Sequence, residues 1–311
     1  MAEMKGLDPI QVEMLKQIAD LHSVPEGAYS LRINGQLHGK NSSEHISIVK
    51  KEDVAGIDII IAPHTKNESV HIPVVLSQSG IKESVYNDFI IGEGCDVTIV
   101  AGCGIHNGGS EGSEHSGIHR FFLGKGAKIR YVEKHYGSGE GTGERVMNPT
   151  TEIFMEEDSY MEMETTQIKG VDSTKRKTEA VLHDKSTLIV HEKIMTHGEQ
   201  FAETEFVVDL KGEDCGTHVV SRSVAKDNSR QLFISDVVGN AKCSGHTECD
   251  AIIMDNASVV AVPKIIANNT EASLIHEAAI GKIAGEQIIK LMTLGLTEQQ
   301  AEEEIINGFL K

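Results

Sequence analysis

I-G-E-G-C-D-V (residues 91–97) is the stretch that decides the fold, because near-copies of it return along the chain. L-G-K-G-A-K-I (123–129), M-E-E-D-S-Y-M (155–161) and L-H-D-K-S-T-L (182–188) keep its order of apolar, polar or glycine, small and apolar positions. The small residues are 32, 32, 27 and 29 positions apart, at Cys95, Ala127, Ser159, Ser186 and Cys215. A repeat that recurs but drifts in length predicts a solenoid whose coils tolerate loop insertions.

The segments between these turns have the alternation of β-strands. Apolar and polar residues alternate in runs such as 97–100, 129–132 and 188–190, and a period of two is typical of strands. Because helical periodicity is missing from about residue 28 to residue 274, a β-helix is the favoured architecture. A β-sandwich is the alternative, although its turns recur more closely, about every 8–12 residues.

Both ends of the chain predict helices. Asp8 suits an N-cap and Pro9 suits the first position of a helix that ends near residues 22–25. Residues 285–294 are periodic, and T-E-Q-Q at 297–300 resembles a capping box that opens a last helix. The expected organisation is therefore a helical segment over 1–27, a β-helix core over 28–275 and a C-terminal helical segment over 276–311.

Composition excludes several classes of function. The net charge of −18 disfavours nucleic acid and anionic membrane surfaces, because binding phosphate needs Lys and Arg. The N-terminus has no apolar region of the signal-peptide type, and no apolar run reaches the length of a membrane span. Five scattered cysteines form a poor disulfide framework, which favours free thiols. We expect a cytoplasmic protein.

The C-terminal part of the chain carries a candidate metal site. A thiol, an imidazole and a carboxylate occur close together at Cys249, His276 and Glu277. Thiolate and imidazole are ligands that suit iron and zinc, so the three residues could hold an iron–sulfur unit or a transition metal. The alternatives are a buried structural cysteine and a His–Glu pair that caps a helix start.

A second candidate group surrounds Cys103, which lies between two glycines. Such a cysteine permits the close approach of another molecule's backbone. His106, His115 and His119 follow, and we expect residues 105–117 to form a polar, mobile loop. The histidines could bind metal, but a flexible loop that happens to be rich in histidine is the favoured explanation. No nucleotide-binding glycine motif accompanies them.

Several segments together resemble the SufB/SufD family of iron–sulfur cluster assembly scaffolds. The tail supplies the most specific ones, and the segments concerned are Cys249-Asp250, His276-Glu-Ala278, Gly281-Lys-Ile283, Gly295 to Ala301, Ile305 to Phe309, Gly102-Cys103 and Gly124 to Tyr131. The resemblance covers most of residues 30–311.

The resemblance implies a right-handed parallel β-helix between helical ends, with subunits that pair through the C-terminal part of the β-helix. It also implies that the C-terminal helices bind SufC, an ABC-type ATPase. A nucleotide site in that partner would fit the missing nucleotide motif in this chain.

The resemblance further assigns roles to single residues. Cys249 and Glu277 match SufB residues of the cluster assembly site, and His276 matches the histidine that SufD contributes at the dimer interface. Cys103 matches a SufB cysteine thought to receive sulfur. One chain would thus combine both sets, which suits a homodimer, although pairing with a SufD-like paralogue is the alternative. The cluster would be of the 4Fe–4S or 2Fe–2S type.

We therefore expect a scaffold rather than an enzyme, supplied by a sulfur donor such as a cysteine desulfurase. The chain lacks an extensive N-terminal helical region, which leaves the docking of that donor open. One alternative is a SufD-like structural subunit without a cluster of its own. Another is a β-helix carbohydrate-active enzyme, which 4% aromatic residues and the absence of Trp disfavour.

Overall fold

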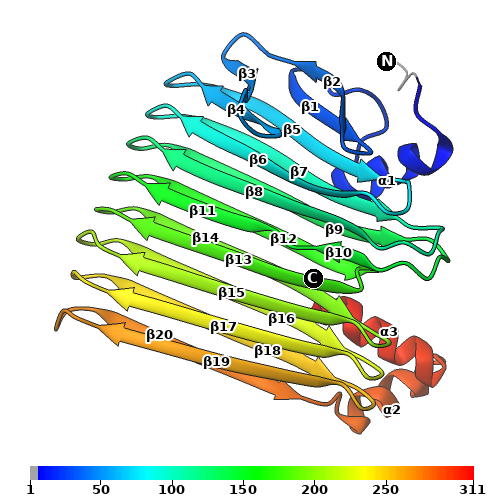
Figure 1. The fold of residues 1–311 in the computed structure, drawn as a ribbon. Helices are drawn as coiled ribbons and strands as arrows, with labels where there is room; N and C mark the ends of the chain where they lie inside the picture. Colours follow the sequence, from blue (N-terminus) through cyan, green and yellow to red (C-terminus); the bar gives the residue numbers. More distant parts are fainter. Residues whose placement is uncertain (1–5) are drawn as a thin grey trace.

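The computed structural model describes residues 6–311, and two facing β-sheets form its centre (Figure 1). Sheet A contains, in spatial order, β2 (Gln36–Asn41), β1 (Ala28–Ile33), β5 (Lys66–Leu76), β7 (Asp96–His106), β9 (Lys128–Ser138), β12 (Tyr160–Lys169), β14 (Thr187–Thr196), β16 (Gly216–Ala225), β18 (Ser244–Ile253) and β20 (Ser273–Gly281). Apart from the β1–β2 hairpin, its neighbouring strands are parallel.

Sheet B is built in the same way. Its strands are, in order, β3 (Ile46–Lys50), β4 (Gly56–Ile61), β6 (Lys82–Ile91), β8 (Ser113–Leu123), β10 (Arg145–Met147) together with β11 (Thr150–Met155), β13 (Ser173–Leu182), β15 (Phe201–Leu210), β17 (Arg230–Gly239) and β19 (Ser258–Ala267). From β5 onward the chain passes back and forth between the two sheets, so each coil adds a strand to both. The predicted β-helix is confirmed, as a solenoid of about 8 turns.

The repeated turns stack into a column along this solenoid. Their small residues are buried, and each carbonyl accepts a hydrogen bond from the coil that follows. Lys128 donates its amide to Cys95 at 2.8 Å, and Tyr160 donates to Ala127 at 2.8 Å. The repeat read from the sequence is therefore a physical column, because only a small side chain fits between neighbouring turns.

Alternation along the strands decides which side chains face the space between the sheets. In β15, half-buried and buried positions alternate over all ten residues. The interior is filled mainly by Ile, Val, Leu and Met, with a few aromatic residues such as Phe89 and Phe121, which stack at 4.4 Å. Polar residues at inward positions are therefore conspicuous.

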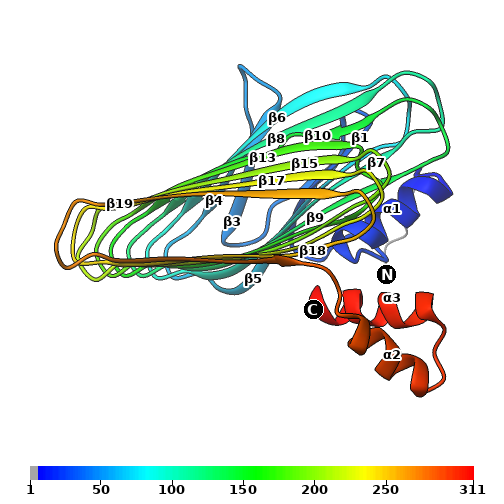
Figure 2. The same ribbon diagram turned by 90° about the horizontal axis from the view of Figure 1, so that it is seen from below.

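Three helices lie on the outer side of sheet A (Figure 2). They are α1 (Pro9–Ala19), α2 (Gly285–Thr293) and α3 (Glu298–Phe309). The N-cap at Asp8 and the capping box at Thr297 are confirmed, since each side chain accepts a hydrogen bond from an amide in the first helical turn, and Asp8 also proves to be part of a capping box. Among the described residues, no helix is long and apolar enough to cross a membrane.

The glycines beside Cys103 serve α1 and not another molecule. A Cβ atom at Gly102 would lie 2.5 Å from the carbonyl oxygen of Ile18, and one at Gly104 would lie 2.6 Å from Met14. The helix can approach β7 closely only because these positions carry no side chain.

The two ends of the solenoid differ. At the first end, the antiparallel hairpins β1–β2 and β3–β4 complete the sheets. At the last end, β19 and β20 each pair with one neighbour, and Val260 and Ile275 are each 51% exposed. Instead of covering this end, α3 packs sideways on Val224 through Ile306 and Leu310.

Two local expectations are wrong. Residues 113–117, expected in a mobile loop, begin strand β8, and His115 and His119 are buried. β20 extends to Gly281, so that His276 and Glu277 lie within a strand rather than at a strand-to-helix boundary. In both cases pairing with neighbouring coils extends the strand beyond its apolar run.

Candidate functional site

Cys249 lies in the middle of β18 and points into the solenoid. It is 1% exposed, whereas its neighbours Glu248 and Asp250 point outward. Burial, with smaller contributions from the charges of Glu192 and Asp250, raises the pKa of the Cys249 thiol to about 12. Cys249 is therefore a protonated, shielded thiol in this conformation.

His276 and Glu277 are neighbours on β20, so they face opposite sides of the sheet. His276 pairs with Thr247 and points inward, and its Nδ1 lies 2.7 Å from the Thr247 hydroxyl. Its Nε2 is buried and has no hydrogen-bond partner among the described residues. Glu277 pairs with Glu248 on the outer face.

The structure thus brings Cys249 and His276 to one side and Glu277 to the other. Cys249 pairs with Ala278, so His276 is its diagonal neighbour on the inner face. Diagonal neighbours on adjacent strands are roughly 7–8 Å apart. The common ligand set of all three residues stays a prediction. It would require the edge strand to twist or open, since the register separates Glu277 from the thiol.

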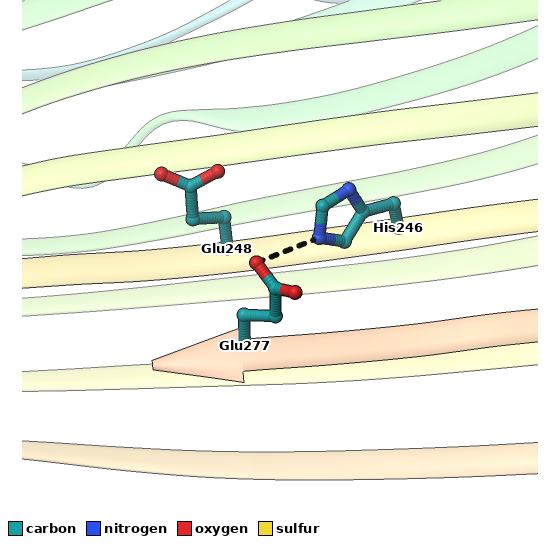
Figure 3. A group of neighbouring side chains, drawn as sticks. All are labelled: His246, Glu248 and Glu277. Atoms are coloured by element: carbon teal, nitrogen blue, oxygen red, sulfur yellow. Dashed lines mark ion pairs between the residues drawn. The ribbon is translucent and has the colours of Figure 1, made fainter. Parts of the chain in front are cut away.

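Glu277 gathers instead with His246 and Glu248 on the outer face of sheet A (Figure 3). One ligand atom from each residue lies within 4.8 Å of the other two, and His246 Nε2 lies 3.5 Å from Glu277 Oε2. We call these residues the outer trio. One imidazole and two carboxylates form a donor set that suits a divalent transition metal.

The outer trio lies beside a groove under the C-terminal helix. The ring of His218 stacks on His246 at 4.9 Å, and the groove encloses about 580 Å³. Glu248, His218 and Lys193 line it together with Lys311, whose carbonyl oxygen accepts a hydrogen bond from Lys193 Nζ at 3.0 Å. A movement of α3 would therefore change access to this face.

Cys103 lies inside the solenoid near its first end, beside buried histidines. Burial tends to raise the pKa of Cys103, but the charge of His115 and hydrogen bonds from His115 and His135 lower it to about 7. Burial tends to lower the pKa of His115, whereas Cys103 and Glu83 raise it to about 10. At neutral pH about half of the Cys103 thiol is therefore ionised beside a protonated imidazole, and the thiolate is the nucleophilic form of cysteine.

Buried charges continue from Cys103 along the interior. His135, which contacts Cys103, lies 3.4 Å from Glu133. Arg176 donates to Glu133, and its Nε lies 3.6 Å from Glu192. These side chains are at most 3% exposed. Each charge in this series has an oppositely charged neighbour, which offsets the cost of burying it, and removal of one partner would leave a buried charge uncompensated.

The series ends at Cys249. Glu192 accepts hydrogen bonds from Thr204 at 3.1 Å and from Ser221 at 2.7 Å, and Ser221 pairs with Cys249 across β16 and β18. β7 and β18 are five strand spacings apart, which is roughly 24 Å. We call this series, from His135 through Glu133, Arg176 and Glu192 to Ser221, the interior polar path.

Most of the interior polar path was not recognised as functional from the sequence. The signal was present: Ile129 and Tyr131 predict the inward positions of their strand, and the same alternation puts Glu133 and His135 inward. His246 and Glu248 are likewise two residues apart and so share a face. What alternation alone does not tell is which residues meet across the sheets.

A family model described as "SUF system FeS cluster assembly, SufBD core domain" matches residues 78–309. The match spans the solenoid coils from β6 onward, both cysteines and the C-terminal helices. The chain belongs to the SufBD family. The predicted relationship is confirmed, and iron–sulfur cluster assembly is the process in which the family takes part.

Curated SufBD-family proteins from archaea are similar along most of their length. The chain is 28% identical over 245 residues to an iron–sulfur cluster assembly SufBD family protein of Methanocaldococcus jannaschii. The aligned residues make up 78% of this chain and 76% of that protein. It is 29% identical to one of Archaeoglobus fulgidus, over 88% of this chain and 72% of the relative. A SufBD-family protein of Pyrococcus horikoshii is 27% identical, over 88% of this chain and 83% of the relative.

Proposed function

We propose that this SufBD-family protein is a scaffold on which a nascent iron–sulfur cluster is built near Cys249. The interior polar path is the observation that carries the proposal. It leads through buried side chains from Cys103, whose pKa is lowered to about 7, to Cys249, which lies beside candidate iron ligands. Sulfur taken up by Cys103 would be protected from solvent on its way to Cys249.

Iron would enter from the opposite side of sheet A. The outer trio offers oxygen and nitrogen ligands at the surface, directly across β18 from the thiol. His276 adds a buried nitrogen without a partner on the inner side. A cluster of the 4Fe–4S or 2Fe–2S type would then use Cys249 and His276, with Glu277 joining when the edge strand moves.

The open last coil supports a homodimer. A solenoid needs its terminal coil to be covered, and here β19 and β20 leave apolar side chains such as Val260 and Ile275 exposed. A second copy would cover this end and bring two sets of Cys249 and His276 together. A SufD-like paralogue is the alternative partner for the same surface.

The C-terminal helices are the proposed docking site of a SufC-like ABC ATPase. Ile289 is 62% exposed and Leu294 is 76% exposed on and after α2, which leaves an apolar surface uncovered. Because Lys311, two residues beyond the end of α3, lines the groove beside the outer trio, ATPase-driven movement of the helices would widen access to that face. In this proposal the protein itself is not an enzyme, and its sulfur comes from a donor such as a cysteine desulfurase.

Anaerobic reconstitution with iron and sulfide tests the scaffold function. The protein should gain sulfide-to-iron charge-transfer absorption, and Cys249→Ser should lose most of it, because a hydroxyl is a poor substitute for a thiolate at iron. Cys215→Ser is the matched control, since Cys215 is also buried but lies in the turn column. Equal iron and sulfide in Cys249→Ser and Cys215→Ser would favour the alternative of a SufD-like structural subunit.

A further inference from the structure

A cavity of about 500 Å³ opens at the first end of the solenoid. It lies between β1 and the β3–β4 turn, and we call it the N-terminal cavity. Arg32 and Ala55 are among the residues at its wall, and Val74 and Val85 are among those at its floor. Its size is within the range of small-molecule sites, and the interior polar path does not include it.

The floor of the N-terminal cavity is one coil away from Cys103. Val74 pairs with Cys103 across β5 and β7, and Val85 pairs with Gly117 across β6 and β8. Paired strands are roughly 4.8 Å apart. Gly117 lies directly beside His115, since a Cβ atom added to it would be 3.4 Å from His115 Nε2. Val74 and Val85 are at most 5% exposed and separate the cavity from this pair, so a donor reaches Cys103 when these side chains turn aside.

Arg32 links the cavity to the thiolate. Its Nη2 donates to Glu83 at 2.9 Å, and Glu83 lies 3.1 Å from His115 Nδ1. Cys103, His115 and Glu83 thus have the order of nucleophile, base and orienting carboxylate seen in activated cysteines. Arg32 lines the cavity, and its Nε is buried without a hydrogen-bond partner among residues 6–311. A shift of this side chain toward the cavity would let an anion supply the missing acceptor.

We propose that the N-terminal cavity admits a low-molecular-weight persulfide that carries a carboxylate, which Arg32 binds while Cys103 attacks the terminal sulfur. The inference rests on the proposed function, in which Cys103 is the first sulfur acceptor. It adds the class of donor and its route of entry. Arg32 and Lys51 are both ion-paired, Arg32 with Glu83 and Lys51 with Asp58 and Asp88. Arg32 is the natural anchor because it has one carboxylate partner where Lys51 has two, and because its Nε has no acceptor among the described residues.

The reaction balances without a further oxidant or reductant. The Cys103 thiolate attacks the outer sulfur of R–S–SH, a new S–S bond forms at Cys103, and the S–S bond of the donor breaks. The products are Cys103–S–SH and the thiolate R–S⁻, which carries away the electron pair and leaves through the cavity. His115, hydrogen-bonded to Cys103, lowers the pKa of the attacking sulfur to about 7 and so favours its ionised form.

The first test compares two donors that differ in charge. Mercaptoacetate persulfide carries a carboxylate, and the persulfide of its amide does not. Mass spectrometry would measure the rate at which Cys103 gains one sulfur atom from each. We expect the carboxylate donor to react roughly tenfold faster, as a charge-assisted hydrogen bond implies. Arg32→Gln should bring the ratio close to one, while the exposed Arg130→Gln should leave it unchanged.

The ratio isolates binding from nucleophilicity. Arg32→Gln also disturbs Glu83 and hence the reactivity of Cys103, but that change affects both donors equally. A second variant leaves Arg32 in place: Ala55→Trp fills the cavity mouth and should slow both donors several-fold. Val49→Trp is its control, because Val49 is equally exposed on β3 and does not line the cavity.

The outcomes separate this inference from the proposed function. If Cys103 accepts sulfur but the donor ratio is the same in Arg32→Gln, or Ala55→Trp reacts like Val49→Trp, the cavity route is overturned and the scaffold function stands. Loading by a protein-bound persulfide alone would also overturn it. If Cys103→Ser accepts sulfur and builds clusters as well as the unaltered protein, the role of Cys103 in the proposed function fails.

Discussion

Replacing Arg176 with Met should be among the most damaging single changes in the solenoid. Arg176 is 3% exposed and lies between Glu133 and Glu192. Removing one partner of a buried ion pair costs about 3–5 kcal/mol, because it leaves an uncompensated charge. We expect a loss of stability at the low end of this range, about 3 kcal/mol. Glu133 would still have His135 as a partner, and Glu192 would still accept hydrogen bonds from Thr204 and Ser221.

This penalty should depend on pH. Burial acts to raise the pKa of Glu133, but the charges of Arg176 and His135 hold it well below its usual range. A carboxylate whose pKa is lowered on folding stabilises the protein above the pKa of the unfolded chain, roughly 4.3, and this stabilisation is lost as the pH falls. The difference between Arg176→Met and the unaltered protein should therefore be largest near neutral pH and shrink in acid.

Amide hydrogen exchange in β12, β13 and β14 is the suitable assay, because coils of a solenoid open locally. A loss of about 3 kcal/mol corresponds to exchange that is faster by roughly a hundredfold. Lys175→Met, on the same strand with a side chain 64% exposed, should change stability by less than about 0.5 kcal/mol. Equal exchange in the two variants at neutral pH would refute the reasoning about the buried charges.

Three further predictions concern the two ends of the path and the docking surface. Alkylation of Cys103 should rise with a midpoint near pH 7, and His115→Gln should move that midpoint upward, because the imidazolium stabilises the thiolate. Glu277→Gln should weaken ferrous-ion binding at least tenfold by removing a ligand of the outer trio, as measured by anaerobic titration of apoprotein in which Cys249→Ser disables the thiol site. Deleting residues 297–311 should abolish co-purification with a SufC-like ATPase while strand content is retained.

Each of these predictions has a clear contrary result. An unchanged midpoint in the His115 variant would mean that another group sets the ionisation of Cys103. Equal affinity in Glu277→Gln and in Glu162→Gln, on the same outer face but distant from the trio, would remove the outer trio from iron binding. A truncated protein that still binds the ATPase would place docking elsewhere, and one that unfolds would make α3 mainly a cap.

Local patterns were sufficient for the architecture. The turn repeat predicted a solenoid, and the N-cap at Asp8 and the capping box at Thr297 predicted where two helices begin. These features depend on residues close in the chain, whose backbone needs and hydrogen bonds can be read in a short window. The cysteines of the tail and of β7 were also singled out from their own neighbourhoods.

Only the tertiary structure decided which residues of these neighbourhoods act together. The sequence by itself determined the repeat, the helices and the candidate residues, because each is encoded within a few positions. The pairing of coils decided the rest: neighbouring strands bring together residues about 30 positions apart, and alternation sends adjacent residues to opposite faces. That is why Glu277 joined His246 and Glu248 instead of Cys249, and why Arg32 reaches Cys103 through two residues distant in the chain.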